Sequence, residues 1–156
     1  MNIEILTNLR DNPERYSNKL ENEGLPIEEI QALEQTWNKG NPFPQALREL
    51  LFLAGKYCYV LDYNIHETQQ EMQDELRDAM QDSGHSFSRP FYIIDNYGGD
   101  QFLFTYLDET LDDPLVYEYA SDAIERERPI DRSLKLTLSQ LINNSIKVAK
   151  EGRNPF

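Results

Sequence analysis

The sequence contains a single cysteine, Cys58, so the chain cannot close an internal disulfide. A lone thiol also excludes a zinc site made of several cysteines. Histidine is almost as scarce: His66 and His85 are 19 residues apart and match neither a His-x-x-x-His nor a His-Glu-x-x-His pattern. We therefore expect no metal, no cofactor and no histidine that acts as a general base.

Long hydrophobic runs are also missing. Apolar stretches such as Leu50–Ala54 are only five residues long, whereas a membrane-spanning helix needs roughly 20. The first four residues lack the basic start and the apolar stretch of a secretory signal. These absences together favour a cytoplasmic protein that does not enter a membrane.

Basic residues are nearly absent from the middle of the chain. Residues 62–122 hold 15 acidic side chains and only two basic ones, Arg77 and Arg89, so this segment carries the whole net charge of −13. The other 95 residues have 13 acidic and 13 basic side chains. A negative field of this kind repels nucleic acid and anionic lipid and attracts cationic partners. We therefore expect neither nucleic-acid binding nor membrane binding.

The remaining composition is that of one folded domain. The chain has 156 residues, of which 39% are hydrophobic and 11% aromatic, which is enough to fill a single core. No internal repeat, low-complexity tract or Gly/Ser linker divides it. We therefore treat residues 1–156 as one domain.

The spacing of apolar residues predicts helices at both ends of the chain and strands in the middle. A period near 3.6 predicts helices over residues 13–20, 26–37, 44–54, 65–81 and 137–150. Alternating, β-branched or aromatic runs predict strands over residues 57–61, 91–94, 101–107 and 115–119. Both faces of 101–107 are apolar, which is typical of a central strand. This order predicts an α+β fold, in which helices at both ends pack on a mostly antiparallel sheet of about four or more strands.

Two segments, in this order, carry a family resemblance. The first reads LPIEEI at residues 25–30 and continues to FPQALRELL at residues 43–51. The second reads DNYGGDQF at residues 95–102 and is followed by PLVY at residues 114–117. An acidic helix start, a helix opened by proline, a Gly-Gly-Asp turn and a Pro-x-Val-Tyr strand in succession resemble the SMI1/KNR4 family, part of the SUKH superfamily of bacterial immunity proteins.

The resemblance covers about residues 25–150 and has implications for fold and function. It implies an α+β fold. Many bacterial members of the family neutralise a toxin by direct binding, and other members act as regulatory interaction proteins. The resemblance therefore implies one of these two functions.

Acidic side chains recur every three or four residues along the expected helix 65–81 and just beyond it. We call this set the acidic ridge; its members are Glu67, Glu71, Asp74, Glu75, Asp78 and Asp82, opposite a stripe of Ile65, Met72, Leu76 and Met80. Like charges at this spacing each cost about 0.2–0.5 kcal/mol, and Arg77 alone offsets part of that cost. The ridge is either a solvated helix face or a docking surface for a basic partner. Because its cost has no visible compensation, we predict that it binds a cationic protein.

A second acidic cluster, made of Asp108, Glu109, Asp112 and Asp113, lies in a loop expected between two strands. Asp and Pro are common turn residues, so the cluster is either an ordinary turn or an extension of the negative surface. Its spacing does not match a calcium-binding loop. We include these four residues in the predicted partner-binding set.

Eight of the nine tyrosines lie in or beside expected strands and are expected mainly as half-buried packing residues. Tyr63 and Tyr97 are the best candidates for exposed aromatic contacts with a partner. Trp37 fits an apolar helix stripe and is expected in the core. Gly98 and Gly99 predict a tight turn with positive φ.

These features predict a non-catalytic protein-binding module. The leading hypothesis is an immunity protein that blocks a basic, nuclease-type toxin, and the alternative is a regulatory or scaffold protein of the SMI1/KNR4 type with no toxin partner. A small hydrolase is a third reading. It is supported only by scattered groups such as Asp95 and Asp100, which have no nucleophile or oxyanion donor beside them in the sequence.

Overall fold

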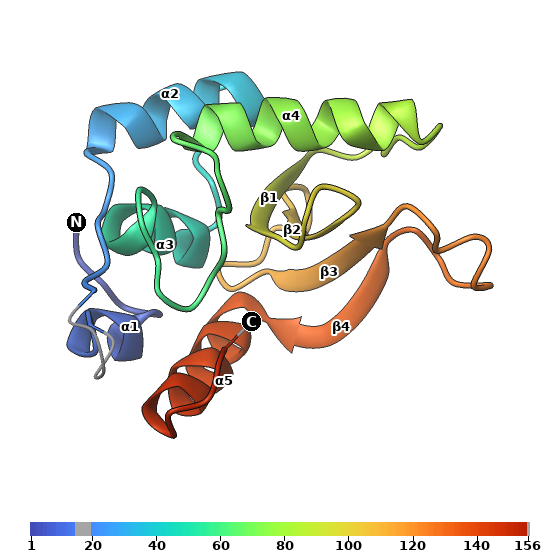
Figure 1. Cartoon of the computed structure of the whole chain (residues 1–156). Helices are drawn as coiled ribbons and strands as arrows, with labels where there is room; N and C mark the ends of the chain where they lie inside the picture. The colour runs from blue at the N-terminus through green and yellow to red at the C-terminus, as the bar shows by residue number, and fades with distance from the viewer. Residues whose placement is uncertain (15–19, 156) are drawn as a thin grey trace.

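The computed structural model describes residues 1–14 and 20–155 of the chain (Figure 1). Its four strands form one antiparallel sheet in the order β1-β2-β3-β4. The predicted α+β fold, with helices at both the N-terminal and the C-terminal side of the sheet, is confirmed. The elements of the described residues are α1 (Thr7–Asp11), α2 (Ile27–Trp37), α3 (Gln45–Ala54), α4 (Gln69–Asp82), β1 (Phe91–Asn96), β2 (Gln101–Tyr106), β3 (Leu115–Ala120), β4 (Arg132–Thr137) and α5 (Leu138–Lys150).

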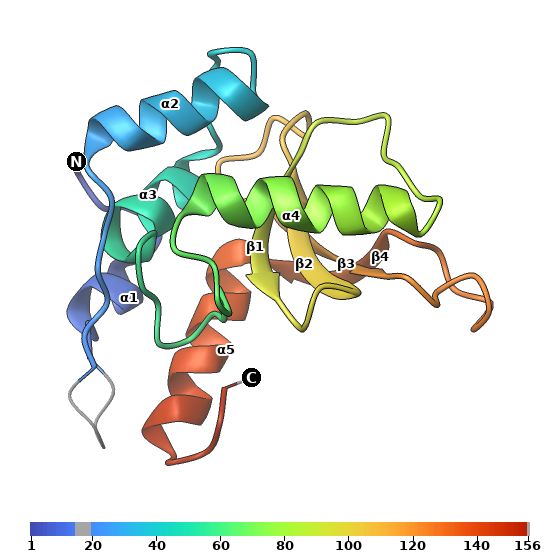
Figure 2. The ribbon, with the colours of Figure 1, turned by 45° about the horizontal axis from the view of Figure 1, so that its top comes forward.

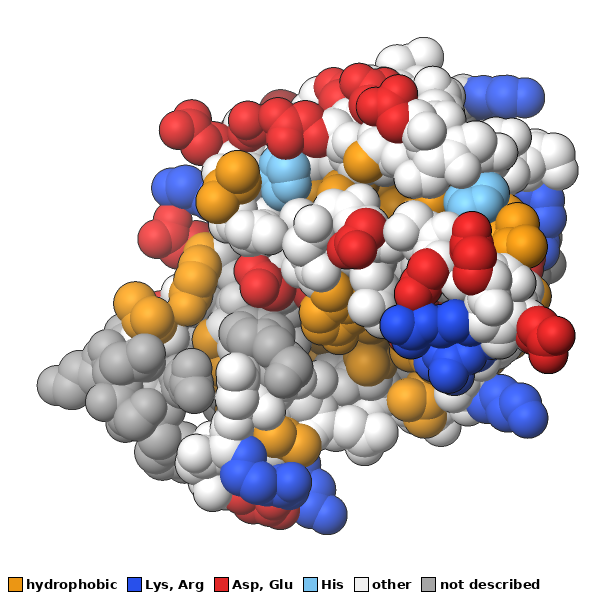
Figure 3. Space-filling view, turned by 45° about the vertical axis from the view of Figure 1, so that its right-hand side comes forward, with side chains coloured by type: hydrophobic (Ala, Val, Ile, Leu, Met, Phe, Trp, Pro, Cys, Tyr) orange, Lys and Arg blue, Asp and Glu red, His pale blue; other side chains and the backbone are white. Residues whose placement is uncertain are grey.

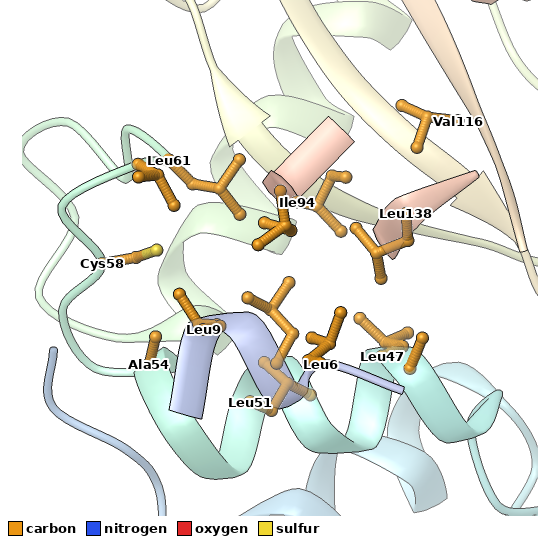
Figure 4. Packing of buried hydrophobic residues seen from close by; sticks show 14 of the residues in the cluster. Leu6, Leu9, Leu47, Leu51, Ala54, Cys58, Leu61, Ile94, Val116 and Leu138 are labelled. Carbon is orange, nitrogen blue, oxygen red and sulfur yellow. The ribbon is translucent and has the colours of Figure 1, made fainter. Parts of the chain in front are cut away.

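The sheet separates two hydrophobic cores. On one face, Ile94, Leu103 and Val116 join the larger core with α1, α2, α3 and α5. Figure 4 shows Leu138 facing Leu47 of α3 in this core, with Ile94 beside Leu138. The other face is rich in aromatic residues and is covered by α4, and this smaller core contains Phe91, Phe102, Phe104, Tyr106, Tyr119, Met72, Leu76 and Met80.

β2 is an interior strand, as its two apolar faces predicted. Phe104 pairs with Ile93 of β1 on one side and with Tyr117 of β3 on the other. After its first residue every side chain of β2 is buried, because α4 covers one face and the larger core covers the other. A strand in this position needs apolar residues at both even and odd positions.

The turn between β1 and β2 has the predicted backbone. Gly98 and Gly99 have φ angles of +101° and +93°, a region that side chains with a Cβ rarely enter. Both glycines donate their N–H groups to Oδ1 of Asn96, each at 2.9 Å. The turn therefore fixes the side chain of Asn96 as well as the direction of the chain.

Prolines mark the starts of two helices, and a capping box marks the start of a third. Pro26 and Pro44 immediately precede α2 and α3 and set an extended backbone there. α5 begins with a capping box, in which Thr137 accepts from the backbone N–H of Gln140 while the Gln140 side chain accepts from that of Thr137. These local signals explain why the boundaries of all three helices were predictable.

The segment 57–61, predicted as a strand, is not part of the sheet. Within it only Tyr57 makes a strand-like bridge, with Glu23. Cys58 and Val60 are nevertheless buried in the larger core. The apolar pattern of residues 57–61 therefore indicates burial in the core and not pairing in the sheet.

The helix predicted from Ile65 starts later, at Gln69. Thr68 caps it by accepting from the backbone N–H of Glu71 at 3.1 Å. Ile65 lies before the cap and is 84% exposed, so it does not belong to the apolar stripe. The prediction was wrong at this end because the spacing of Ile65 happens to match the helix period.

Two further elements differ from the prediction. Of the helix expected over 13–20, residues 15–19 lie outside the described part of the chain, and Glu14 forms a bridge with Glu21 instead of a helix. The first helix is α1, whose start is fixed by Glu49: this buried carboxylate accepts from the backbone N–H groups of Glu4, Ile5 and Leu6 at 2.7–2.9 Å.

β4 was not predicted. It is a half-exposed edge strand, and a register shift in its pairing with β3 accompanies a positive φ of 56° at Lys135. An irregular, partly polar edge of this kind lacks the apolar run by which the other strands were found. Among the described residues no helix is both long and apolar enough to cross a membrane.

Candidate protein-binding site

α4 lies over the aromatic face of the sheet and along the free edge of β1. Its side chain Gln73 is fully buried and bonds to Ile93 twice, donating to the carbonyl at 2.8 Å and accepting from the N–H at 3.0 Å. The amide thus takes the place that a neighbouring strand would have. This contact, together with Met72, Leu76 and Met80, fixes which side of α4 faces the protein.

Five members of the acidic ridge lie on the opposite, outer side of α4, and Glu67 lies just before its cap residue Thr68. Five of the ridge members are exposed and Glu71 is half-buried. Figure 3 shows acidic side chains gathered along the top of the molecule, where α4 runs in Figure 1. In the part of the chain that the structure describes, no ridge carboxylate forms an ion pair with a lysine or an arginine.

Arg77, expected to offset part of the ridge charge, lies against the body of the protein instead. Its guanidinium donates to the carbonyl of Phe91 at 2.5 Å and is sandwiched between the rings of Trp37 and Phe91, 3.9 and 4.0 Å from their centroids. Burial lowers the pKa of Arg77 to about 10. The ridge is therefore less compensated than the sequence suggested.

Some ridge residues also have local structural roles. Glu71 accepts from the backbone N–H of Glu67 at 2.8 Å, and Asp74 accepts from the side chain of Gln70 at 3.1 Å. In contrast, the carboxylates of Asp78 and Asp82 make no hydrogen bond or ion pair among the described residues. These two are the best positions at which to change the charge without disturbing the fold.

The structure brings His66 to the ridge, which the sequence did not predict. Ligand atoms of His66, Glu71 and Glu75 lie within 4.8 Å of one another, close enough to consider a metal centre. The side chain of His66 is 5% exposed, and its Nδ1 lies 3.3 Å from Oε2 of Glu75.

The hydrogen bonds of His66 argue against a metal. The Nδ2 atom of Asn96 lies 3.1 Å from the Nε2 atom of His66. The Oδ1 atom of Asn96 already accepts from the N–H groups of Gly98 and Gly99. Asn96 must therefore donate to Nε2, so the ring proton of a neutral His66 is on Nδ1. The nitrogen that faces the two carboxylates then has no lone pair for a metal, whereas a ligating histidine donates its other N–H.

Two carboxylates of the second acidic cluster bind other residues of the chain. Asp108 accepts from Arg89 at 2.7 Å, and this hydrogen bond lowers the pKa of Asp108. Asp113 accepts from the backbone and the hydroxyl of Ser139, at 2.9 and 2.5 Å, and so supports the start of α5. Two of its carboxylates therefore have structural partners, and the role of the cluster in partner binding remains a prediction.

The carboxylates of Glu109 and Asp112 complete this cluster. Glu109 is half-buried and its Oε1 lies 3.7 Å from Nη2 of Arg89, while Asp112 is exposed. The backbone carbonyl of Asp112 accepts from the N–H of Ala46 at 2.8 Å, which ties the loop to the start of α3. The loop is thus built as a structural corner, as expected for Asp-rich turns.

The two tyrosines predicted as exposed contacts differ. Tyr63 is half-buried between the two cores and donates its hydroxyl to the carbonyl of Ala54 at 3.0 Å, so the expectation that it is exposed was wrong. Tyr97 is 39% exposed at the β1–β2 turn. Of the two, only Tyr97 presents substantial surface to a partner.

Asp95 is a buried carboxyl of β1 that the sequence gave little reason to single out. It accepts from the backbone N–H of Asp62 at 2.8 Å and is 3% exposed. Burial raises its pKa to about 7, despite hydrogen bonds from Asp62 and Tyr97. Asp100 is exposed on the following turn, so the two carboxyls occupy different environments.

Comparison with known proteins gives no match: no protein family, curated protein or solved structure corresponds to the chain. The resemblance to the SMI1/KNR4 family therefore stays a prediction. The function of the ridge has to be inferred from its own geometry and charge.

Proposed function

We propose that the chain is a non-catalytic protein-binding module whose acidic ridge docks a cationic partner protein. The leading partner is a basic, nuclease-type toxin that the chain keeps inactive by direct binding, as the resemblance to the SMI1/KNR4 family implies. In this proposal α4 provides the contact surface and the sheet beneath it keeps α4 rigid.

The observation that supports the proposal best is a contrast between the ridge and the other acidic side chains. Several carboxylates elsewhere have an arginine as partner, with N···O distances of 2.7–3.0 Å; these pairs are Arg48–Glu34, Arg89–Asp108, Arg126–Asp122 and Arg132–Glu118. The ridge lacks such partners among the described residues. A partner protein that carries lysines or arginines would supply them.

The position of the ridge on α4 supports the same proposal. Asp78 and Asp82 lie in the C-terminal part of the helix, which has no basic residue in its last turn. Negative charge near a helix C-terminus is unfavourable by about 0.3–1 kcal/mol, because the helix dipole already places partial negative charge there. A solvated face selected only for stability would carry lysine at these positions.

The test replaces Asp78 and Asp82 by lysine. Proteins captured by the immobilised chain from a lysate of its source cells are identified, and the association of each purified partner is then measured at low and high salt. We expect a one-to-one complex with a basic protein, an on-rate that falls with salt, and at least a tenfold slower on-rate for the double variant at low salt.

A matched control replaces Glu21 and Glu125, which are exposed and distant from α4 in the sequence, by lysine. It changes the net charge by the same amount, so a specific ridge effect must be absent from it. Equal on-rates for the parent chain and the Asp78→Lys/Asp82→Lys variant would contradict the proposal. Loss of the partner's nuclease activity in the complex supports the toxin hypothesis, while binding without inhibition favours a regulatory or scaffold protein.

A further inference from the structure

A groove runs between α2 and the N-terminal half of α4, next to the acidic ridge. Both helices run along the top of the molecule in Figure 1, and in Figure 2, which brings this side forward, α4 lies below α2. The groove has a volume of about 490 Å³, and its apolar walls include Leu25, Pro26, Leu33, Tyr63 and Met72. Pockets that bind small molecules or anchor side chains have roughly this size and this apolar lining.

Hydrogen bonds fix the position of α4 relative to α2 and to the rest of the protein. The indole N–H of Trp37, at the end of α2, donates to the side chain of Gln70 on α4 at 3.2 Å. Gln69 joins the start of α4 to the body of the protein, because it donates to the carbonyl of Gly55 at 2.8 Å and accepts from the hydroxyl of Tyr92 at 2.9 Å. The groove is therefore formed before any occupant arrives, which lowers the entropic cost of binding.

The side of α2 that faces the groove carries small residues. Ala32 and Thr36 line the groove and are both exposed, although larger apolar side chains at these positions would fill it. Ile65 does not line the groove, but it belongs to the same segment before α4 as the lining residues Tyr63 and His66 and is 84% exposed. An open apolar groove beside an exposed isoleucine favours contact with an apolar group of another molecule.

The charges around the groove are negative. Glu29 and Glu67 line it and are exposed, and Glu71 and Glu75 continue the negative surface along α4. Among the described residues that line the groove, Lys56 is the one lysine or arginine, and it is already paired with Glu23 at 2.8 Å. An occupant therefore gains from carrying positive charge on either side of its apolar group.

We infer that the α2–α4 groove receives a bulky apolar side chain of the cationic partner, flanked in the partner's sequence by lysine or arginine. The inference rests on the proposed function and adds an anchor to it: the ridge steers the partner by charge, and the groove holds one side chain in a preformed hollow. Buried anchors of this kind commonly carry much of the affinity of an interface.

The test uses a blocked pentapeptide with one phenylalanine between two pairs of lysines. Trp37 is the single tryptophan of the chain and bonds to a residue that lines the groove, so its fluorescence reports occupancy. We expect saturable binding, and binding at least tenfold weaker when glycine replaces the phenylalanine or glutamates replace the lysines. Equal binding of any of these peptides would overturn the inference.

A filled groove is the matched variant. Ala32→Phe should weaken the lysine-phenylalanine peptide at least tenfold, while Gln31→Phe, an exposed neighbour that does not line the groove, should leave it unchanged. Thr36→Phe serves the same purpose if Ala32→Phe fails to fold, as judged by circular dichroism. Unchanged binding in a folded, filled variant would also overturn the inference.

The same variants separate this inference from the proposed function. If Ala32→Phe binds the natural partner normally while Asp78→Lys/Asp82→Lys does not, the groove is not the anchor and the ridge proposal stands. If the filled variant loses the partner while the charge variant keeps it, the ridge proposal fails instead.

Discussion

At the scale of single residues, Asp95 links the pH to the stability of the fold. It is buried beneath the loop that contains Asp62, and burial raises its pKa to about 7. Below about pH 4 the carboxyl is protonated in both the folded and the unfolded chain. Between pH 4 and pH 7 the unfolded chain loses this proton first, so stability falls as the pH rises.

We predict that Asp95→Asn removes this pH dependence. Asparagine keeps an acceptor for the N–H of Asp62 but cannot ionise, so the variant should gain stability relative to the parent as the pH rises from about 4 to about 7. One pKa unit corresponds to about 1.4 kcal/mol, so the relative gain is on the order of 4 kcal/mol at most. Urea unfolding followed by Trp37 fluorescence measures it.

The control for this prediction is Asp100→Asn. Asp100 is exposed on the adjacent turn, so the same chemical change should leave the pH dependence as in the parent chain. Parallel pH profiles for Asp95→Asn and the parent would show that the carboxyl ionises equally easily in both states.

At the scale of elements, the attachment of α4 depends on a few buried polar contacts. The amide of Gln73 satisfies both backbone groups of Ile93, and Arg77 satisfies the carbonyl of Phe91. In addition, the carbonyl of Asp62 accepts from the N–H of Asn96 at 2.8 Å. Together these contacts close the edge of β1 without another strand.

We predict that Gln73→Leu destabilises the chain by roughly 2–5 kcal/mol. Leucine has a similar size but leaves the N–H and the carbonyl of Ile93 buried without partners, and each unsatisfied group costs about 1–3 kcal/mol. Chemical unfolding measures the loss. Gln81→Leu, at an exposed position of the same helix, should change stability by less than about 0.5 kcal/mol, and an equal loss in the two variants would contradict this account.

The sequence predicted those elements whose local signals agree with their tertiary surroundings. Strands β1 to β3 have apolar runs that the cores bury, and α5 has a capping box at Thr137. The segment 57–61 failed because burial without pairing leaves the same apolar pattern as a strand. β4 was missed because a half-exposed edge with a register shift needs few apolar residues.

At the scale of the whole molecule, eight acidic side chains outside the ridge pair with a lysine or an arginine among the described residues, whereas none of the ridge does. The net charge is −13, and the middle segment 62–122 carries all of it. Spacing along the sequence was enough to predict the ridge. The sequence alone could not predict three features, because each depends on contacts between distant segments. These are the packing of Arg77 against Trp37 and Phe91, the position of His66 beside Glu71 and Glu75, and the α2–α4 groove.

We predict that salt stabilises the chain through the ridge. Three like-charged pairs of α4 at i,i+4 spacing, 71/75, 74/78 and 78/82, together cost roughly 1 kcal/mol at low ionic strength. Raising the ionic strength from about 0.01 M to about 0.15 M shortens the Debye length from about 30 Å to about 8 Å. The melting temperature should therefore rise by about 2–4 °C in a thermal unfolding experiment followed by circular dichroism.

The charge variants give the control. Asp78→Lys/Asp82→Lys removes two of the three repulsive pairs, so its melting temperature should start higher and respond less to salt. Glu21→Lys/Glu125→Lys should respond like the parent. A melting temperature that falls with salt, or equal salt effects in all three proteins, would argue against repulsion along α4.

The side-chain closure of β1 also bears on how copies of the chain could aggregate. A glutamine amide, rather than a strand, satisfies the backbone of β1 at this edge. If α4 detaches, the backbone N–H and carbonyl groups of β1 become free to pair, and its sequence FYIIDN is apolar and poor in charge. Such an open edge pairs readily with the same edge of a second copy. Agents or substitutions that loosen α4 should therefore produce fibrillar or strand-exchanged assemblies that grow from β1.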